Sequence, residues 1–218
     1  NVLKYKGERA AKPLLFLEVR QAIIDQYPNS VVICDGMEAD DYLGIKGYEN
    51  FLHYKETGVW KYLLSFIDKD ILMVLSPSLD FSKIEKGIYF QTAEEGARCF
   101  ASQLLSGDKS TDNILGLPNF TDSIKEKYKL KKVKGIGKAS ALAMLEGCDV
   151  KEMFVRVVDS YKSYYGDSDK FTSWRGDELE FSWLDHLQES AYLLWMQRHE
   201  GELIDMREFL EKMEIDCG

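Results

Sequence analysis

The first 105 residues alternate between segments of helical periodicity and short apolar segments typical of strands. In order, these are a helix over 14–28, a strand over 30–34, a helix over 38–54, an apolar run over 61–67, a strand over 88–90 and a helix over 92–105. Glu95 stands at the capping-box position after Thr92 and marks the start of the last helix. The alternation predicts an α/β core with a mostly parallel sheet flanked by helices.

The second half of the chain has a different pattern. No strand is predicted after residue 105, so residues 1–105 are interpreted as the α/β core and 106–218 as a helical region. The chain has 218 residues, enough for one globular domain or a main domain with a small appendage.

No apolar run approaches the roughly 20 residues that a membrane span requires. The four scattered cysteines form no CxxC pair, which favours a reducing cytoplasm over a disulfide framework or a zinc site.

Charge is unevenly distributed along the sequence. The formal net charge is −9, yet residues 125–138 hold seven lysines and one acid, a window of +6 against −15 for the rest. Such segregation is typical of a stripe that binds a polyanion on an otherwise acidic protein. A solvated lysine-rich loop is the alternative.

Carboxylates follow the predicted strands in three clusters. They are Glu38, Asp40 and Asp41 after the run 30–34, Asp68 and Asp70 after the run 61–67, and Asp108 with Asp112 further along. The carboxyl ends of strands line the ligand crevice of an open α/β sheet, so these acids are expected to converge. Converging carboxylates need cations between them, and a pair of Mg²⁺ or Mn²⁺ ions is the usual arrangement for phosphodiester hydrolysis. Each cluster has an alternative interpretation as helix-start, capping or turn residues.

A glycine-rich turn follows the lysines. Gly135-Ile136-Gly137 precedes a segment rich in Ala and Leu, and Lys134 and Lys138 flank the turn. Small glycines let the backbone approach a phosphate, and the N–H groups at a helix start can receive the anion. The pattern looks like a helix–hairpin–helix that binds DNA.

Taken in order, these motifs resemble the 5′ nucleases, which include phage 5′–3′ exonucleases, flap endonucleases and the 5′-nuclease domain of bacterial DNA polymerase I. The resemblance covers about residues 4–146. It is carried by Tyr5-Lys-Gly-Glu-Arg9, Glu38-Ala-Asp-Asp41, Asp68-Lys-Asp70, Gly107-Asp with Asp112-Asn-Ile, and Gly135-Ile-Gly137. It implies a PIN-like core and a structure-specific nuclease that cuts near the 5′ end of flap, nicked or duplex DNA in replication or repair.

The resemblance also implies roles for individual residues. The metal ligands would be Glu38, Asp40, Asp41, Asp68, Asp70, Asp108 and Asp112, with two Mg²⁺ or Mn²⁺ ions. Lys6 and Arg9 match basic residues above the scissile phosphate in the family. The DNA-binding residues would be Lys131, Lys132, Lys134, Gly135, Ile136, Gly137 and Lys138, in a turn where the family often binds K⁺ through backbone carbonyls.

Three features depart from the family. The family begins with a strand carrying an essential Asp, which would lie before Asn1, so we expect a separate or preceding N-terminal polypeptide to complete the active site. The Asp108–Asp112 spacing is one residue longer than usual, and residues 119–132 form an insertion.

A non-catalytic DNA-binding chain is the alternative function, and a haloacid-dehalogenase-like phosphatase fits poorly. The expected location is the cytoplasm of a bacterium or of a phage-infected cell.

Overall fold

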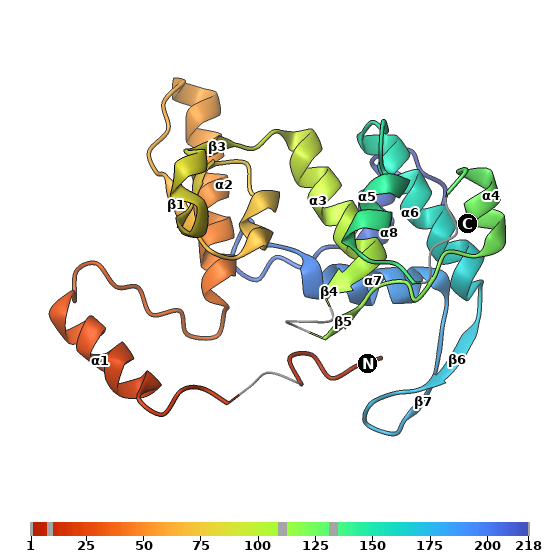
Figure 1. Ribbon diagram of the computed structural model, residues 1–218, viewed down its shortest axis with the longest axis horizontal. Helices are drawn as coiled ribbons and strands as arrows, with labels where there is room; N and C mark the ends of the chain where they lie inside the picture. Colours follow the sequence, from red (N-terminus) through yellow and green to blue (C-terminus); the bar gives the residue numbers. More distant parts are fainter. Residues whose placement is uncertain (1, 8–10, 109–112, 131–134, 218) are drawn as a thin grey trace.

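The computed structural model describes residues 2–7, 11–108, 113–130 and 135–217, and its first half combines helices with a small sheet (Figure 1). The elements are α1 (Phe16–Gln26), α2 (Ala39–Thr57), β1 (Leu64–Phe66), the 3₁₀ helix η1 (Lys69–Met73), β2 (Pro77–Asp80), the 3₁₀ helix η2 (Phe81–Lys86), β3 (Tyr89–Phe90) and α3 (Ala93–Ser106). The sequence prediction of an α/β protein is therefore confirmed.

The second half is mostly helical but also contains two hairpins. Its elements are β4 (Gly107–Asp108), β5 (Ile114–Leu115), α4 (Asp122–Lys127), α5 (Lys138–Met144), α6 (Val150–Tyr165), β6 (Asp169–Thr172), β7 (Glu178–Phe181), α7 (Trp183–Leu194) and α8 (Met206–Glu211). The expectation that no strand follows residue 105 is wrong. Strands of two to four residues are too short to leave a clear alternating pattern.

The main sheet is small and mixed. Its order is β1-β2-β3, with β1 parallel to β2 and β2 antiparallel to β3. The prediction of a mostly parallel sheet is therefore only partly right. The connection from β2 to β3 is little more than η2, and so short a link favours an antiparallel return over a parallel crossover.

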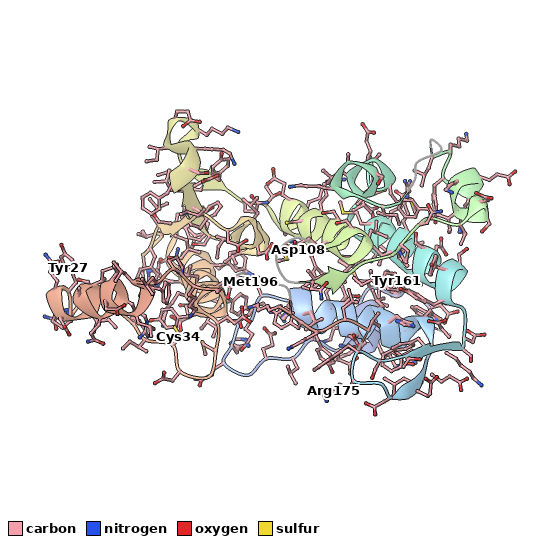
Figure 2. All side chains as sticks on the ribbon, turned by 60° about the horizontal axis from the view of Figure 1, so that its bottom comes forward. Tyr27, Cys34, Asp108, Tyr161, Arg175 and Met196 are labelled. Carbon is pink, nitrogen blue, oxygen red and sulfur yellow. The ribbon has the colours of Figure 1, made fainter. Side chains whose placement is uncertain are left out.

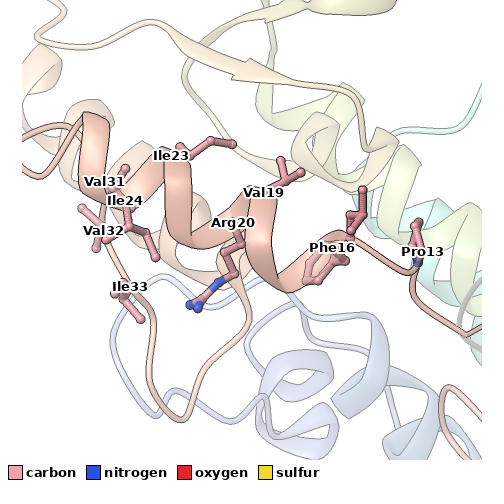
Figure 3. A pocket seen from close by; sticks show the side chains of 10 residues that line it. Pro13, Phe16, Val19, Arg20, Ile23, Ile24, Val31, Val32 and Ile33 are labelled. Atoms are coloured by element: carbon pink, nitrogen blue, oxygen red, sulfur yellow. The ribbon is translucent and has the colours of Figure 1, made fainter.

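Residues 30–34, expected to form a strand, do not pair with any strand in the described chain. Val32 is 59% exposed, and the segment lies against α1, where the two line an apolar groove of about 510 Å³ (Figure 3). None of the α1 residues, Phe16–Gln26, is buried. A β-branched run indicates a strand only where a neighbouring strand can pack against it.

The main hydrophobic core surrounds α3. The side chains of Phe100, Ala101, Leu104 and Leu105 are buried there against α5, α6 and α7. The Tyr161 hydroxyl of α6 donates a 2.8 Å hydrogen bond to the backbone carbonyl of Leu104 (Figure 2 labels Tyr161). The helix begins as the sequence predicts, with a capping box between Thr92 and Glu95.

A second, smaller core holds the sheet to the rest of the molecule. Leu64, Phe66, Ile71 and Val74 pack there with Met196, which follows α7. Helix α3 contacts η1 as well as the C-terminal helices and so connects the two cores.

All four cysteines are free thiols. In the described ranges, every helix is too short or too polar to cross a lipid bilayer.

Candidate functional site

Four of the predicted acids line one cavity of about 150 Å³ between the two cores. They are Glu38, Asp40, Asp41 and Asp70. The walls come from the start of α2, from η1 and from residues 192–197 and 202–204, which lie at the end of α7 and beyond it. We call this hollow the carboxylate cavity. It joins acids that are about 30 positions apart in the sequence.

Local backbone structure explains where these acids lie. Glu38 is the N-cap residue of α2, with extended backbone angles, and Asp40 and Asp41 occupy the first turn of that helix. Acids are favourable there because the exposed N–H groups carry a partial positive charge. The Asp68 carboxylate accepts a 3.2 Å hydrogen bond from the Asp70 backbone N–H and thereby caps η1.

Protein donors contact all four carboxylates, and Asp40 accepts a 3.0 Å hydrogen bond from the backbone N–H of Asp41. Glu38 accepts a 3.1 Å hydrogen bond from the Tyr5 hydroxyl and forms an ion pair with the ammonium group of Lys6. Asp41 accepts hydrogen bonds from the backbone N–H of Gln197 at 3.2 Å and from its side-chain amide at 3.3 Å. These contacts fix the directions of the carboxylates within the cavity.

The fourth wall residue, Asp70, is oriented from α3. The side-chain amide of Gln103 donates a 2.5 Å hydrogen bond to the Asp70 carboxylate. Gln103 is only 6% exposed, so this contact is held by the main core.

The cavity is electrostatically unfavourable for its two central acids. Partial burial raises the pKa of Asp40, and the negative charge of Glu38 raises it further. Burial also raises the pKa of Asp41; the backbone N–H of Gln197 opposes this effect, and Glu38 adds to it. A positive ion in the cavity would relieve both effects.

The oxygen atoms that line the cavity are of the kind that binds hard cations. Carboxylate oxygens are the ligands that Mg²⁺ and Mn²⁺ prefer. Among the described residues, however, no group of three or more His, Cys, Asp or Glu side chains lies close enough together to hold a metal ion. The Lys6 ammonium forms an ion pair with Glu38.

Of the other predicted acids, Asp68 and Asp108 are described, and neither lines this cavity. Asp68 is exposed, and Asp108 is a buried residue of β4, 6% exposed, near the C-terminal end of α3 (Figure 2). Asp112 and Arg9 fall outside the described residues. The structure therefore brings four of the seven predicted metal ligands, and Lys6, into one neighbourhood.

The predicted DNA-binding turn opens a helix, as expected. Gly135 has a left-handed φ of +75°, Ile136 is buried in the main core, and Gly137 is the N-cap residue of α5. Among the described residues, no atom lies within 4 Å of a Cβ at Gly137, so the described part of this surface is open. The Gly137 N–H donates a 3.0 Å hydrogen bond to the Ser140 hydroxyl, which an incoming phosphate would have to replace. Lys138 is the first residue of α5.

The lysine stripe is described only in part. Lys131, Lys132 and Lys134 lie outside the described residues. Of the others, Lys125 pairs with Asp122 at 3.2 Å and Lys127 with Asp159 at 2.6 Å. These two pairs reduce the positive charge that α4 offers to a polyanion.

Sequence reasoning missed several residues of the cavity. Gln103 and Gln197 hold the acids, and Glu202 on the far wall is paired with Arg198 at 2.5 Å. Single amides and a lone acid have no characteristic spacing that would single them out. Tyr5 is the exception. It precedes Lys6 in the motif Tyr5-Lys-Gly-Glu-Arg9, and this position could have indicated that Tyr5 lies near the site.

Comparisons with protein-family models, with curated proteins and with solved structures give no match to this chain.

Proposed function

We propose that the chain is a metal-dependent, structure-specific 5′ nuclease that hydrolyses DNA, with a PIN-like core and a helix–hairpin–helix. The observation that carries this proposal is the carboxylate cavity, which Glu38, Asp40, Asp41 and Asp70 line from two separate segments. The raised pKa values of Asp40 and Asp41 support it because they indicate a place where a cation would be stabilised.

In the proposed reaction the four acids would hold Mg²⁺ or Mn²⁺. When bound, two such ions supply a hydroxide nucleophile and stabilise the leaving 3′ oxygen. Gln197 and Gln103 would keep Asp41 and Asp70 in fixed directions. Lys6 would turn from Glu38 towards the scissile phosphate and stabilise the charge that develops on it.

The turn at Gly135–Gly137 would hold the duplex away from the cut. Its open surface beside Gly137 and the neighbouring Lys138 suit a DNA phosphate, and Lys131, Lys132 and Lys134 would add charge to the same surface. A K⁺ ion bound by backbone carbonyls of this turn is part of the proposal. Duplex binding here and cutting at the carboxylate cavity would select DNA with a free 5′ end.

A second candidate function is DNA binding without cleavage. The specific observation in its favour is that Glu38, Asp41 and Asp70 are each held by a protein donor in this conformation. In this case an N-terminal polypeptide would be needed to draw these acids into a metal site. The two candidates make different predictions for the isolated chain.

The test is cleavage of a 5′-labelled flap duplex by the chain with Mg²⁺, with EDTA as the control. We expect Asp41→Asn and Asp70→Asn to lower the cleavage rate about 100-fold or more, because each removes a charged ligand. Asp25→Asn is the matched control, since Asp25 is an exposed acid of α1 that accepts a 2.8 Å hydrogen bond from the Gln21 side chain and does not line the cavity. Asp68→Asn decides whether that exposed acid takes part.

One outcome would contradict the proposed role of Asp70, and another would contradict the nuclease itself. Undiminished cleavage by Asp70→Asn would remove this acid from the metal site. If the wild-type chain shifts the flap duplex on a gel but does not cut it with either Mg²⁺ or Mn²⁺, the DNA-binding candidate replaces the enzyme.

A further inference from the structure

A second hollow, open and of about 540 Å³, lies beside the carboxylate cavity. It is bounded by the N-terminal segment, by the tip of the β6–β7 hairpin and by α7. We call it the aromatic groove, and the residues that matter to it are Lys4, Tyr5, Trp174, Arg175 and Tyr192. Figure 2 shows Arg175 at the tip of the hairpin, on the outside of the molecule.

The groove combines exposed aromatic rings with cations. Trp174 is 45% exposed and Tyr192 is 49% exposed. The Lys4 ammonium lies 5.7 Å from the centroid of the Trp174 ring, and the Arg175 guanidinium lies 4.9 Å from it. An indole at a hairpin tip with two cations near its ring is poorly buried for its size, which is typical of a binding surface.

The groove is continuous with the carboxylate cavity. Tyr5, Tyr192 and Leu193 line both hollows. The Tyr5 hydroxyl also donates to Glu38, so the same residue forms part of the groove wall and holds a cavity acid. A chain-like ligand lying in the groove would therefore lead directly to the four acids.

The N-terminal segment that forms one wall is held in place by specific contacts. The Val2 N–H donates a 2.9 Å hydrogen bond to Glu189 of α7. The Asn113 side-chain amide donates a 3.0 Å hydrogen bond to the carbonyl of Lys4. These contacts fix Lys4 and Tyr5 against α7 and give the groove a defined shape.

Charge in the groove is balanced, which limits the kind of ligand. Asp185 and Glu189 on α7 offset Lys4 and Arg175. The Asp185 carboxylate accepts hydrogen bonds of 2.6 and 2.8 Å from Ser182 as part of the cap of α7, and these hold the pKa of Asp185 below its usual range. A duplex backbone, which is held mainly by charge, finds no excess of cations among the described residues that line the groove. Unpaired bases, which are held by stacking on aromatic rings, do not require one.

We propose that the aromatic groove binds a short unpaired stretch of nucleic acid, whose bases stack on Trp174 and Tyr192 and whose phosphates contact Lys4 and Arg175. The inference rests on the proposed function, because it assigns to this groove the unpaired strand that leads to the cut. It separates two binding modes in one protein: charge holds the duplex at Gly135–Lys138, and stacking holds the single strand here.

The test is the binding of a short fluorescein-labelled thymidylate oligomer, measured by anisotropy in EDTA with the full chain. We expect Trp174→Ala to weaken binding about tenfold, Trp174→Phe to retain most of it and Arg175→Ala to cause a smaller loss. Two phosphate contacts to a single strand predict a slope of log K on log[salt] of about −1.4. Lys170→Ala is the matched control for Arg175→Ala, because Lys170 is on the same hairpin, is 76% exposed and faces Glu180.

The proposal is overturned if a stably folded Trp174→Ala variant binds the oligomer as tightly as the wild type does. It is also overturned if a blunt duplex of the same length competes equally well for the Trp174-dependent binding. If the nuclease proposal is wrong, the result is different. Neither the wild type nor any variant then cleaves the flap duplex with Mg²⁺, while the oligomer still binds in a Trp174-dependent way. In that case the groove stands and the enzymatic proposal falls.

Discussion

His186 is a buried histidine whose environment favours its neutral form. Its side chain is 5% exposed and stacks on Tyr165 with 3.8 Å between ring centroids. Its Nε2 atom lies 3.0 Å from an Asp169 carboxylate oxygen, which connects α7 to β6. Burial lowers the pKa of His186, and the hydrogen bond to Asp169 opposes this effect without cancelling it.

The lowered pKa sets the direction of a pH effect on stability. In the unfolded chain a histidine has a pKa of about 6.5, so it takes up a proton more readily than His186 does in the folded protein. The free energy of unfolding is therefore highest above about pH 6.5 and falls as the pH decreases below that value. We expect wild-type stability to decline between about pH 7.5 and pH 5, and His186→Gln to decline less. Urea unfolding at each pH measures this. His199→Gln, at an exposed histidine, is the control, and equal declines in wild type and His186→Gln would contradict the argument.

At the same scale, the sequence predicts the acids of the candidate site but not what holds them. Glu38, Asp40 and Asp41 were placed in a crevice because a strand was expected before them, and that strand is absent from the described residues. They reach the cavity as helix-start residues of α2, with Glu38 at the N-cap and Asp40 and Asp41 in the first turn, which is the alternative interpretation of the sequence. Gln197 contacts Asp41 from 156 positions away, and such pairing depends on packing that no local pattern records.

Gly116, directly after β5, lies very close to the backbone at the end of α3. A Cβ at Gly116 would lie 2.2 Å from the backbone nitrogen of Gly107 and 2.4 Å from the backbone carbonyl carbon of Ser106. Because these are backbone atoms, they cannot rotate away as a side chain would. Gly107 has a φ of +67° and faces Gly116 across the same contact, so both positions require glycine.

We therefore expect Gly116→Ala to lower the free energy of unfolding by about 2–3 kcal/mol, in the range of overpacking substitutions. The measurement is urea unfolding at neutral pH. Gly137→Ala serves as the control, since a Cβ there meets no atom of the described residues within 4 Å and the φ of −111° suits alanine. A loss at Gly116 no greater than that at Gly137 would mean that the hairpin relaxes around the added methyl group.

Among the elements, those with strong local signals were predictable. The start of α3 is fixed by its own capping box, and its apolar face matches the main core. Strand β2 was missed because it begins with Pro77 and Ser78 and has no β-branched residue. For α1 the periodicity correctly predicts a helix but says nothing of burial: its apolar side chains are left out of both cores.

The candidate site depends on the whole molecule rather than on one half. The sheet side supplies the acids, and residues 192–204 from the C-terminal half supply the opposite wall of the cavity. Met196 enters the smaller core while its neighbour Gln197 holds Asp41, so the C-terminal segment stabilises the sheet and orients the site together. An interpretation of the site from residues 1–105 alone would miss this wall.

The charge distribution is also a property of the whole molecule. It allows a test of whether the proposed binding of DNA depends on the lysine stripe or only on the total charge of the protein. Each phosphate neutralised on a duplex contributes about −0.9 to the slope of log K on log[salt], so Lys131, Lys132 and Lys134 changed together to Ala should make the slope less steep by up to about 2.7. The matched control changes the exposed lysines Lys55, Lys61 and Lys86 to Ala, which alters the net charge equally. Duplex binding measured by anisotropy from low to moderate salt gives both slopes. If the control flattens the slope as much as the stripe variant does, the attraction follows total charge and the stripe is not the duplex-binding surface.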